Sequence, residues 1–129
     1  MSYDWAEFLR LAESLESNPD SPGPREAALR SAASRAYYAA FHQALDHAIG
    51  EGFSPAYTGD DHRRVQAYFR RYSPPSKIRR KIAQELARLL AERHKADYRN
   101  DIGKRPQSLA SHAIGMATRI IENLKSLNL

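Results

Sequence analysis

Hydrophobic residues recur every three or four positions along most of the chain, which is the spacing of an amphipathic α-helix. The first such segment predicts a helix that begins near Tyr3 or Asp4, with Asp4 as a candidate N-cap. Its apolar face consists of Trp5, Phe8, Leu11, Ala12 and Leu15. The proline-rich stretch SNPDSPGP cannot continue a helix and connects it to the next element. Strand-like alternation hardly appears, so the chain is predicted to be all-α.

Four more helices follow from the same spacing. The second runs from about Pro24 to Gly50, and the fourth opens near Ser76 and continues through ERHKADY. Between them, Asp60 or Asp61 can cap a short helix over HRRVQAYFRRY, and the fifth helix runs from Pro106 almost to the end. The stripe of the second helix is made of small residues that allow close packing: Leu29, Ala33, Ala36, Ala40, Ala44 and Ala48. The fourth helix carries Ile78, Ile82, Leu86 and Leu89, and the fifth carries Leu109, Ala113, Met116, Ile120, Leu124 and Leu127. About five helices with short breaks predict one antiparallel bundle, a single domain over residues 1–129.

Composition narrows the chemistry. The chain has no cysteine, which excludes disulfides, thiolate nucleophiles and thiolate-bound zinc. No apolar run approaches the roughly 18 residues of a membrane span, and MSYDWAEFLR does not have the layout of a secretory signal, so we expect a cytoplasmic protein without a membrane partner. No phosphate-binding loop or Walker pattern occurs. The histidines do not fall at ligand spacing, and we therefore predict neither a metal nor another cofactor.

The charge distribution permits an acidic partner. The formal net charge is +5, and the basic residues are concentrated in the middle of the chain. Arginine doublets at 63–64, 70–71 and 79–80 alternate with Tyr68, Phe69 and Tyr72, a composition that can contact phosphates and stack on bases. The alternative is that these doublets form an ordinary solvated face.

The segment SRAYYAAFH places chemically active side chains on a helix that is otherwise rich in alanine. Seven residues make about two helical turns, so Arg35 and His42 project from nearly the same face, which Tyr38 and Asp46 share. Asp46 follows His42 by four residues, a spacing at which it can orient the imidazole and raise its affinity for a proton. An arginine and an oriented histidine are groups that metal-free phosphodiester cleavage needs. The alternative is a structural pair on a solvated face.

Two later segments repeat parts of this chemistry. In RHKADY, Arg93 and Asp97 are four residues apart and predict an ion pair, and Arg93 could also serve a phosphate site. In RPQSLASH, Arg105 and His112 repeat the arginine-to-histidine spacing at the start of the last helix. Both pairs remain candidates for the working site.

The order of these motifs resembles the HEPN domain family. SRAYYAAFHQAL, then a histidine in DDHRRV, then RHKADY are similar to the compact prokaryotic branch of that family. The resemblance implies a helical bundle that commonly forms a homodimer. It also implies that the protein belongs to a toxin–antitoxin or defence system, in which the partner is often a nucleotidyltransferase-like antitoxin.

The same resemblance implies site residues. Many HEPN proteins are metal-independent endoribonucleases in which an arginine is followed by a histidine, here Arg35 and His42. The other motif positions, Tyr38, His62, Arg93, Asp97 and Tyr98, are implied to bind RNA or another ligand. Two hypotheses follow: an RNA-binding protein that is a ribonuclease, or a non-catalytic module that binds a nucleotide or assembles with a nucleotidyltransferase-like partner.

Overall fold

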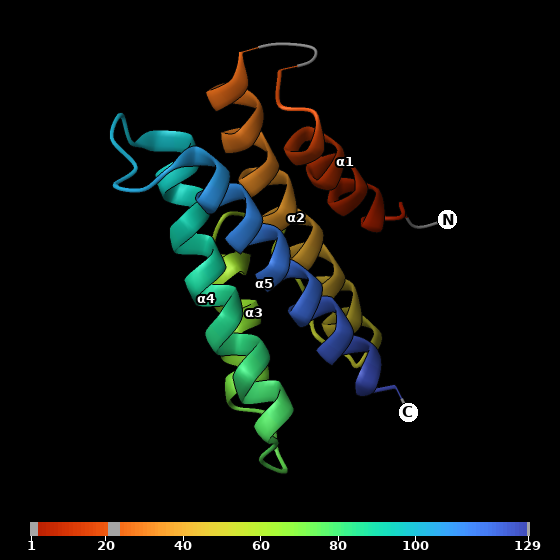
Figure 1. The fold of residues 1–129 in the computed structure, drawn as a ribbon. Coiled ribbons are helices and arrows are strands. Elements are labelled where there is room, and N and C mark those ends of the chain that lie inside the picture. The colour runs from red at the N-terminus through yellow and green to blue at the C-terminus, as the bar shows by residue number, and fades with distance from the viewer. Residues whose placement is uncertain (1–2, 21–23, 129) are drawn as a thin grey trace.

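The computed structural model describes residues 3–20 and 24–128, and this part of the chain contains five helices and no strand. The helices are α1 (Ala6–Ser17), α2 (Arg25–Gly50), α3 (Asp61–Arg70), α4 (Lys77–Tyr98) and α5 (Pro106–Ser126), as Figure 1 shows. The prediction of an all-α bundle is confirmed, and the bounds agree with the predicted ones to within a few residues. Of the predicted connection SNPDSPGP, residues 21–23 lie outside the described residues.

The long helices lie side by side, with α1 antiparallel to α2 and α4 antiparallel to α5 (Figure 1). The starts of α2 and α5 lie at the same end of the bundle, where Arg25 donates to the Gln107 side chain at 3.4 Å. Gln107 in turn donates to Glu16, near the end of α1, at 3.2 Å. These bonds tie three helices together at one end.

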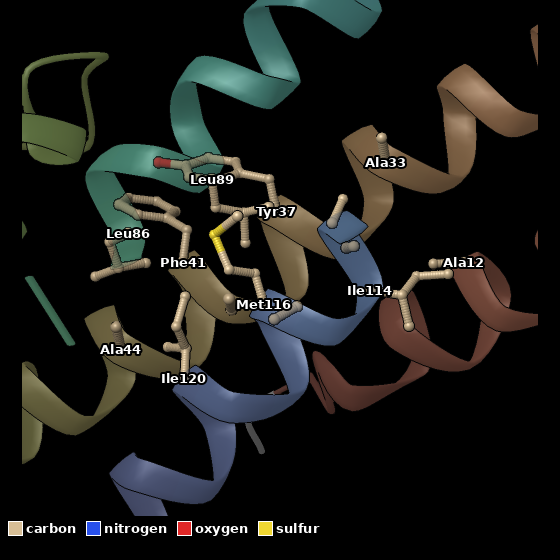
Figure 2. Close-up of a cluster of buried hydrophobic side chains, with 14 of the residues drawn as sticks. Ala12, Ala33, Tyr37, Phe41, Ala44, Leu86, Leu89, Ile114, Met116 and Ile120 are labelled. Atoms are coloured by element: carbon tan, nitrogen blue, oxygen red, sulfur yellow. The ribbon is translucent and has the colours of Figure 1, made fainter. Parts of the chain in front are cut away.

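Small residues on α2 let the other helices approach closely. Every member of the predicted stripe on α2 is buried. Figure 2 shows Tyr37 and Phe41 of α2 gathered with Leu89 of α4 and with Met116 and Ile120 of α5. Since α2 packs against each of the other helices, it is the central element of the core.

Two predicted core positions are wrong. Leu11 is 47% exposed and Ile78 is 40% exposed. Leu11 directly precedes Ala12, the buried residue of α1, and Ile78 lies in the first turn of α4, before its first buried residue, Arg79.

Side chains accept backbone hydrogen bonds at the starts of two helices, α1 and α4. The fourth helix begins next to Ser76 as predicted, and Ser76 caps it by accepting a hydrogen bond from the Arg79 backbone N–H at 3.2 Å. Asp4 accepts one from the Ala6 backbone N–H at 3.1 Å. The prediction that Asp60 or Asp61 caps α3 is wrong, because no side chain accepts a cap hydrogen bond there. The carboxylate of Asp61 turns back to the preceding loop instead.

An ion pair joins the end of α2 to the start of α4. Arg79 donates to both carboxylate oxygens of Glu51, at 2.9 and 2.6 Å, and its guanidinium lies 3.5 Å from the ring centroid of Tyr72. The Tyr68 hydroxyl donates to the same carboxylate at 2.7 Å. Arg79 is 7% exposed, so this member of the predicted basic surface is a structural residue.

No helix in the described part of the chain is both long enough and apolar enough to cross a membrane.

Candidate functional site

The motif on α2 faces a pocket of about 330 Å³. Three of the predicted site residues, Tyr38, His42 and His62, line it together, although His62 comes from α3. The remaining lining residues are Phe41, Leu45, Tyr57, Thr58, Gly59 and Asp61. Two segments distant in sequence, SRAYYAAFH and the loop that leads into DDHRRV, therefore form one site.

A buried phenol fixes the tautomer of His62. The Tyr37 hydroxyl lies 2.5 Å from Nδ1 of His62. Burial raises the pKa of Tyr37 far above its usual value, so the phenol keeps its proton. Because the buried hydroxyl has no other acceptor among the described residues, we assign it as the donor to Nδ1. A neutral His62 then carries its own proton on Nε2, which makes no hydrogen bond among the described residues. Burial, followed by the charge of Arg93, lowers the pKa of His62.

His42 stacks on an aromatic residue that the motif analysis did not assign to the site. Its ring lies parallel to the indole of Trp5, with the centroids 3.6 Å apart and an interplanar angle of 10°. Burial, followed by the charge of His62, lowers the pKa of His42 to about 4. His42 is therefore neutral at pH 7.

The prediction that Asp46 orients His42 and raises its proton affinity is wrong. The described residues contain no hydrogen bond between these two side chains, and the pKa of His42 falls rather than rises. Packing against Trp5 removes water from the imidazole, which disfavours its charged form. Asp46 lines a different pocket, with Asp4, Trp5 and residues from the end of α5.

Arg93 lies behind the pocket and is 9% exposed. It donates to the Tyr38 hydroxyl at 2.7 Å and contacts the Asp97 carboxylate at 3.5 Å, so the predicted ion pair between Arg93 and Asp97 is confirmed. Asp97 also accepts a hydrogen bond from Ser34 at 3.2 Å. The Arg93 Nε atom is buried without a hydrogen-bond partner in the described part of the chain. Arg93 therefore holds Tyr38 in place and puts a positive charge next to the site.

Arg35 lies beside this pocket but does not line it. Its guanidinium is 5.0 Å from the ring centroid of Phe8 and 5.4 Å from that of Tyr38. The Tyr38 ring in turn lies 6.1 Å from the ring of His42. The structure thus connects Arg35 to His42 through Tyr38 and gives no direct contact between them.

The second arginine–histidine pair is split between two places. Arg105 lines a pocket at the starts of α2 and α5 with Arg25 and Gln107. His112 lines a different pocket, between α4 and α5, with Arg88 and Arg119. Of the two pairs, only Arg35 and His42 lie around one site.

Tyr98 is 74% exposed at the end of α4 and does not line the pocket. Its ring centroid is 5.9 Å from the guanidinium of Arg93. It is therefore near the buried arginine, on the outside of the bundle.

The arginine doublets divide between structure and surface. Arg63 and Arg64 pair with Asp60 and Asp61 at 2.7 and 2.6 Å. A pocket of about 500 Å³ on α3 is lined by Phe53, Arg64, Ala67, Tyr68, Arg71, Tyr72 and Ser73. This surface combines aromatic rings with two arginines.

Motif reasoning did not identify Trp5, Tyr57 and Asp61 as parts of the site. Trp5 was assigned to the core face of the first helix, where its apolar spacing places it. Tyr57 belongs to a loop without periodicity, and Asp61 was interpreted as a cap. A signal for Asp61 was its position directly before His62 in DDHRRV.

The described residues contain no group of three or more histidine, aspartate and glutamate side chains that could hold a metal ion. No family model, curated protein or solved structure matches the chain. The motifs and the geometry of the pocket are therefore the basis for a functional proposal.

Proposed function

We propose that this chain is a HEPN-type protein that binds RNA by taking one nucleotide into the pocket lined by Tyr38, His42 and His62. The observation that carries the proposal is the meeting of these three side chains around one pocket of about 330 Å³. These three are among the seven site residues that the HEPN resemblance implied from motifs alone. Arg93, the next residue of the motif series, contacts Tyr38 from behind.

Charge supports an anionic ligand. Among the described residues, Asp61 is the only carboxylate that lines the pocket, and its oxygens accept hydrogen bonds from the backbone N–H groups of Ala56 and Tyr57 and from Arg64. Arg93 places its guanidinium next to the pocket, since it donates to the hydroxyl of Tyr38, which lines the pocket, at 2.7 Å. The Asp97 carboxylate, 3.5 Å from Arg93, offsets part of this charge but does not line the pocket, so a phosphate-bearing ligand meets no unbonded carboxylate there.

The polar groups suit a nucleotide. The Nε2–H of His62 is a donor without a partner in the described part of the chain, and neutral His42 offers one donor and one acceptor. Aromatic rings from Tyr38 and Phe41 provide apolar walls. Bases are recognised in proteins by this combination of ring contact and edge hydrogen bonds.

Metal-independent RNA cleavage at the same pocket is a second candidate, favoured by the two adjacent imidazoles. One neutral imidazole would take the proton of a ribose 2′-hydroxyl as its oxygen attacks phosphorus. The other, as imidazolium, would protonate the departing 5′-oxygen, giving a 2′,3′-cyclic phosphate and a 5′-hydroxyl end. Because His42 and His62 both have lowered pKa values, one protonated partner is available only at acidic pH. Cleavage would therefore be fastest below neutral pH.

The alternative is a non-catalytic module. At neutral pH both imidazoles are uncharged, so neither can act as the acid that cleavage needs. In that case the chain binds its nucleotide without turnover and works as part of an assembly. A homodimer and a nucleotidyltransferase-like partner are the assemblies that the HEPN resemblance suggests.

The experiment uses purified full chain and a mixed single-stranded RNA pool in excess EDTA, with binding and cleavage measured from pH 5 to pH 8. The variants His42→Ala and His62→Ala remove the pocket imidazoles. His112→Ala removes an exposed histidine of α5 that lines a different pocket, and it serves as the matched control. Circular dichroism establishes that each variant is folded.

We expect the wild type and His112→Ala to bind RNA equally, and the two pocket variants to bind it more weakly. Cleavage at acidic pH that is lost in either pocket variant would establish that the chain is a ribonuclease acting at this pocket. Binding without cleavage at any pH would show that it is a non-catalytic binding module. If the wild type binds no RNA and no nucleotide, or if only His112→Ala loses activity, the proposed site is wrong.

A further inference from the structure

The loop between α2 and α3 presents Tyr57 to solvent at the edge of the pocket. The residue is 81% exposed and lines the pocket together with Tyr38, His42 and His62. Its backbone φ is 59°, in the left-handed region that side chains other than glycine rarely adopt. Among the described residues it is the only one other than glycine with a positive φ.

A buried carboxylate holds this loop in its conformation. Asp61 accepts hydrogen bonds from the backbone N–H groups of Ala56 and Tyr57, at 3.0 and 2.8 Å. Arg64 donates to the same carboxylate at 2.6 Å and to the Ser54 carbonyl oxygen at 2.9 Å. We call the contacts of Asp61 and Arg64 with residues 54–57 the loop clasp.

The loop clasp is charged at neutral pH. Asp61 is 3% exposed, and burial alone would raise its pKa, but the hydrogen bonds from Ala56, Tyr57 and Arg64 outweigh burial and lower it. An ionised carboxylate that accepts hydrogen bonds from two successive peptide N–H groups therefore fixes the backbone that leads into Tyr57.

This arrangement contributes little to folding on its own. A strained φ costs free energy, and an aromatic ring that is 81% exposed recovers little of it by burial. Strained residues that the surroundings hold in place are concentrated at ligand sites. The ring faces no other aromatic ring among the described residues, so one ring face is open to a ligand.

We propose that Tyr57 is the stacking platform of the nucleotide pocket, held by the loop clasp so that the base of the bound nucleotide lies against its ring. The inference rests on the proposed function, because it names what one residue contributes to that same site. Stacking is tolerant of sequence, since every base has a π face, so Tyr57 would set affinity more than base preference. Thr58 and Gly59, which also line the pocket, are small and leave room beside the ring.

The test compares Tyr57→Phe, Tyr57→Leu and Tyr57→Gly with the wild type. The probes are AMP, GMP, CMP and UMP and a short single-stranded RNA, measured by calorimetry in EDTA. Phenylalanine keeps the ring, leucine keeps apolar bulk without a π face, and glycine removes both. Ile78→Ala, at an exposed position in the first turn of α4, is the control.

We expect Tyr57→Phe and Ile78→Ala to bind like the wild type. Tyr57→Leu and Tyr57→Gly should bind about tenfold to a hundredfold more weakly, the measured range for one stacked base. Tyr57→Gly should also melt at a higher temperature than Tyr57→Leu, because glycine accepts the positive φ without strain. Weaker binding by a more stable variant cannot be explained by loss of the fold.

Failure of this inference differs from failure of the proposed function. A wild type that binds none of the probes would overturn both. Wild-type binding with equal affinity in the leucine and glycine variants would overturn the stacking role alone. If these variants bind normally but change the oligomeric state in sedimentation, Tyr57 is a contact between copies of the chain and the inference is likewise wrong.

Discussion

Trp5 of the segment before α1 stacks on His42 of α2, with ring centroids 3.6 Å apart and an interplanar angle of 10°. Trp5 is the only tryptophan in the chain, so its emission reports on this one contact. The contact also explains why a histidine in an alanine-rich helix stays neutral, since the indole covers a face of the imidazole that water would otherwise solvate.

The Trp5 fluorescence should follow the protonation of His42, because a protonated imidazole in contact with an indole quenches its emission. We expect an emission change with a midpoint near pH 4, the value to which burial lowers the pKa of His42. Circular dichroism at each pH separates this transition from acid unfolding. The His42→Ala protein should lack it; a midpoint near 6.5 in the wild type would mean that the imidazole is not shielded.

Stability should fall as the pH is lowered from about 6.5 to about 4. The folded state holds the pKa of His42 below its unfolded value of 6.5, so the unfolded chain binds protons first in this window. One such group lowers the free energy of unfolding by up to about 1.4 kcal/mol per pH unit. Burial lowers the pKa of His62 in the same direction.

Urea unfolding at pH 7, 6 and 5 measures this slope. The double variant His42→Ala, His62→Ala should show a flatter dependence, although its stability at pH 7 is lower. An equal slope in the double variant and the wild type would assign the acid sensitivity to other groups.

The elements of the fold could be predicted because helical spacing and helix-breaking prolines act locally. The alanine stripe of α2 was sufficient to predict close packing against another helix, but not that α2 contacts all four other helices. The partners of the site residues, and the protonation of His42, could not be predicted from local sequence. His42 and Asp46 have the spacing of an interacting pair, but Trp5, 37 residues earlier, controls the imidazole through tertiary packing. Likewise, Asp61 is at a helix start, where capping was expected, and instead binds the loop that precedes it.

Arg79 shows the same limit of local reasoning. Within KIRRK it has the composition of a solvated basic run, yet it is 7% exposed. What buries it is Glu51, 28 residues away at the end of α2. Composition alone could not distinguish it from Arg80, which is exposed.

Replacing Glu51 by glutamine should destabilise the protein by about 3 kcal/mol, because Arg79 keeps its buried charge and loses its counter-ion. The hydrogen bond from Arg79 lowers the pKa of Glu51 to about 2. The stability that this carboxylate contributes is therefore present above its unfolded value of 4.5 and is lost as the pH falls towards 2. Chemical denaturation at pH 7 and pH 3 measures both effects.

Asp60→Asn is the control for Glu51→Gln, because it removes a carboxylate from an exposed pair with Arg63. Its cost should stay below about 1 kcal/mol. Similar costs for the two variants would show that the pair between Glu51 and Arg79 is no stronger than a surface ion pair.

Larger side chains in the alanine stripe should distinguish the effect of core packing on stability from the effect of helix propensity. Ala40→Leu places a larger side chain at a fully buried position of α2, whereas Ala27→Leu adds the same atoms at an exposed position of the same helix. Because α5 and α4 pack directly on the stripe, Ala40→Leu should cost about 1–3 kcal/mol from overpacking. Ala27→Leu should change stability by less than about 0.5 kcal/mol, since leucine and alanine are both good helix formers. Thermal and urea unfolding of the two proteins give the comparison, and equal stabilities would mean that the helices around α2 are less closely packed than the structure has them.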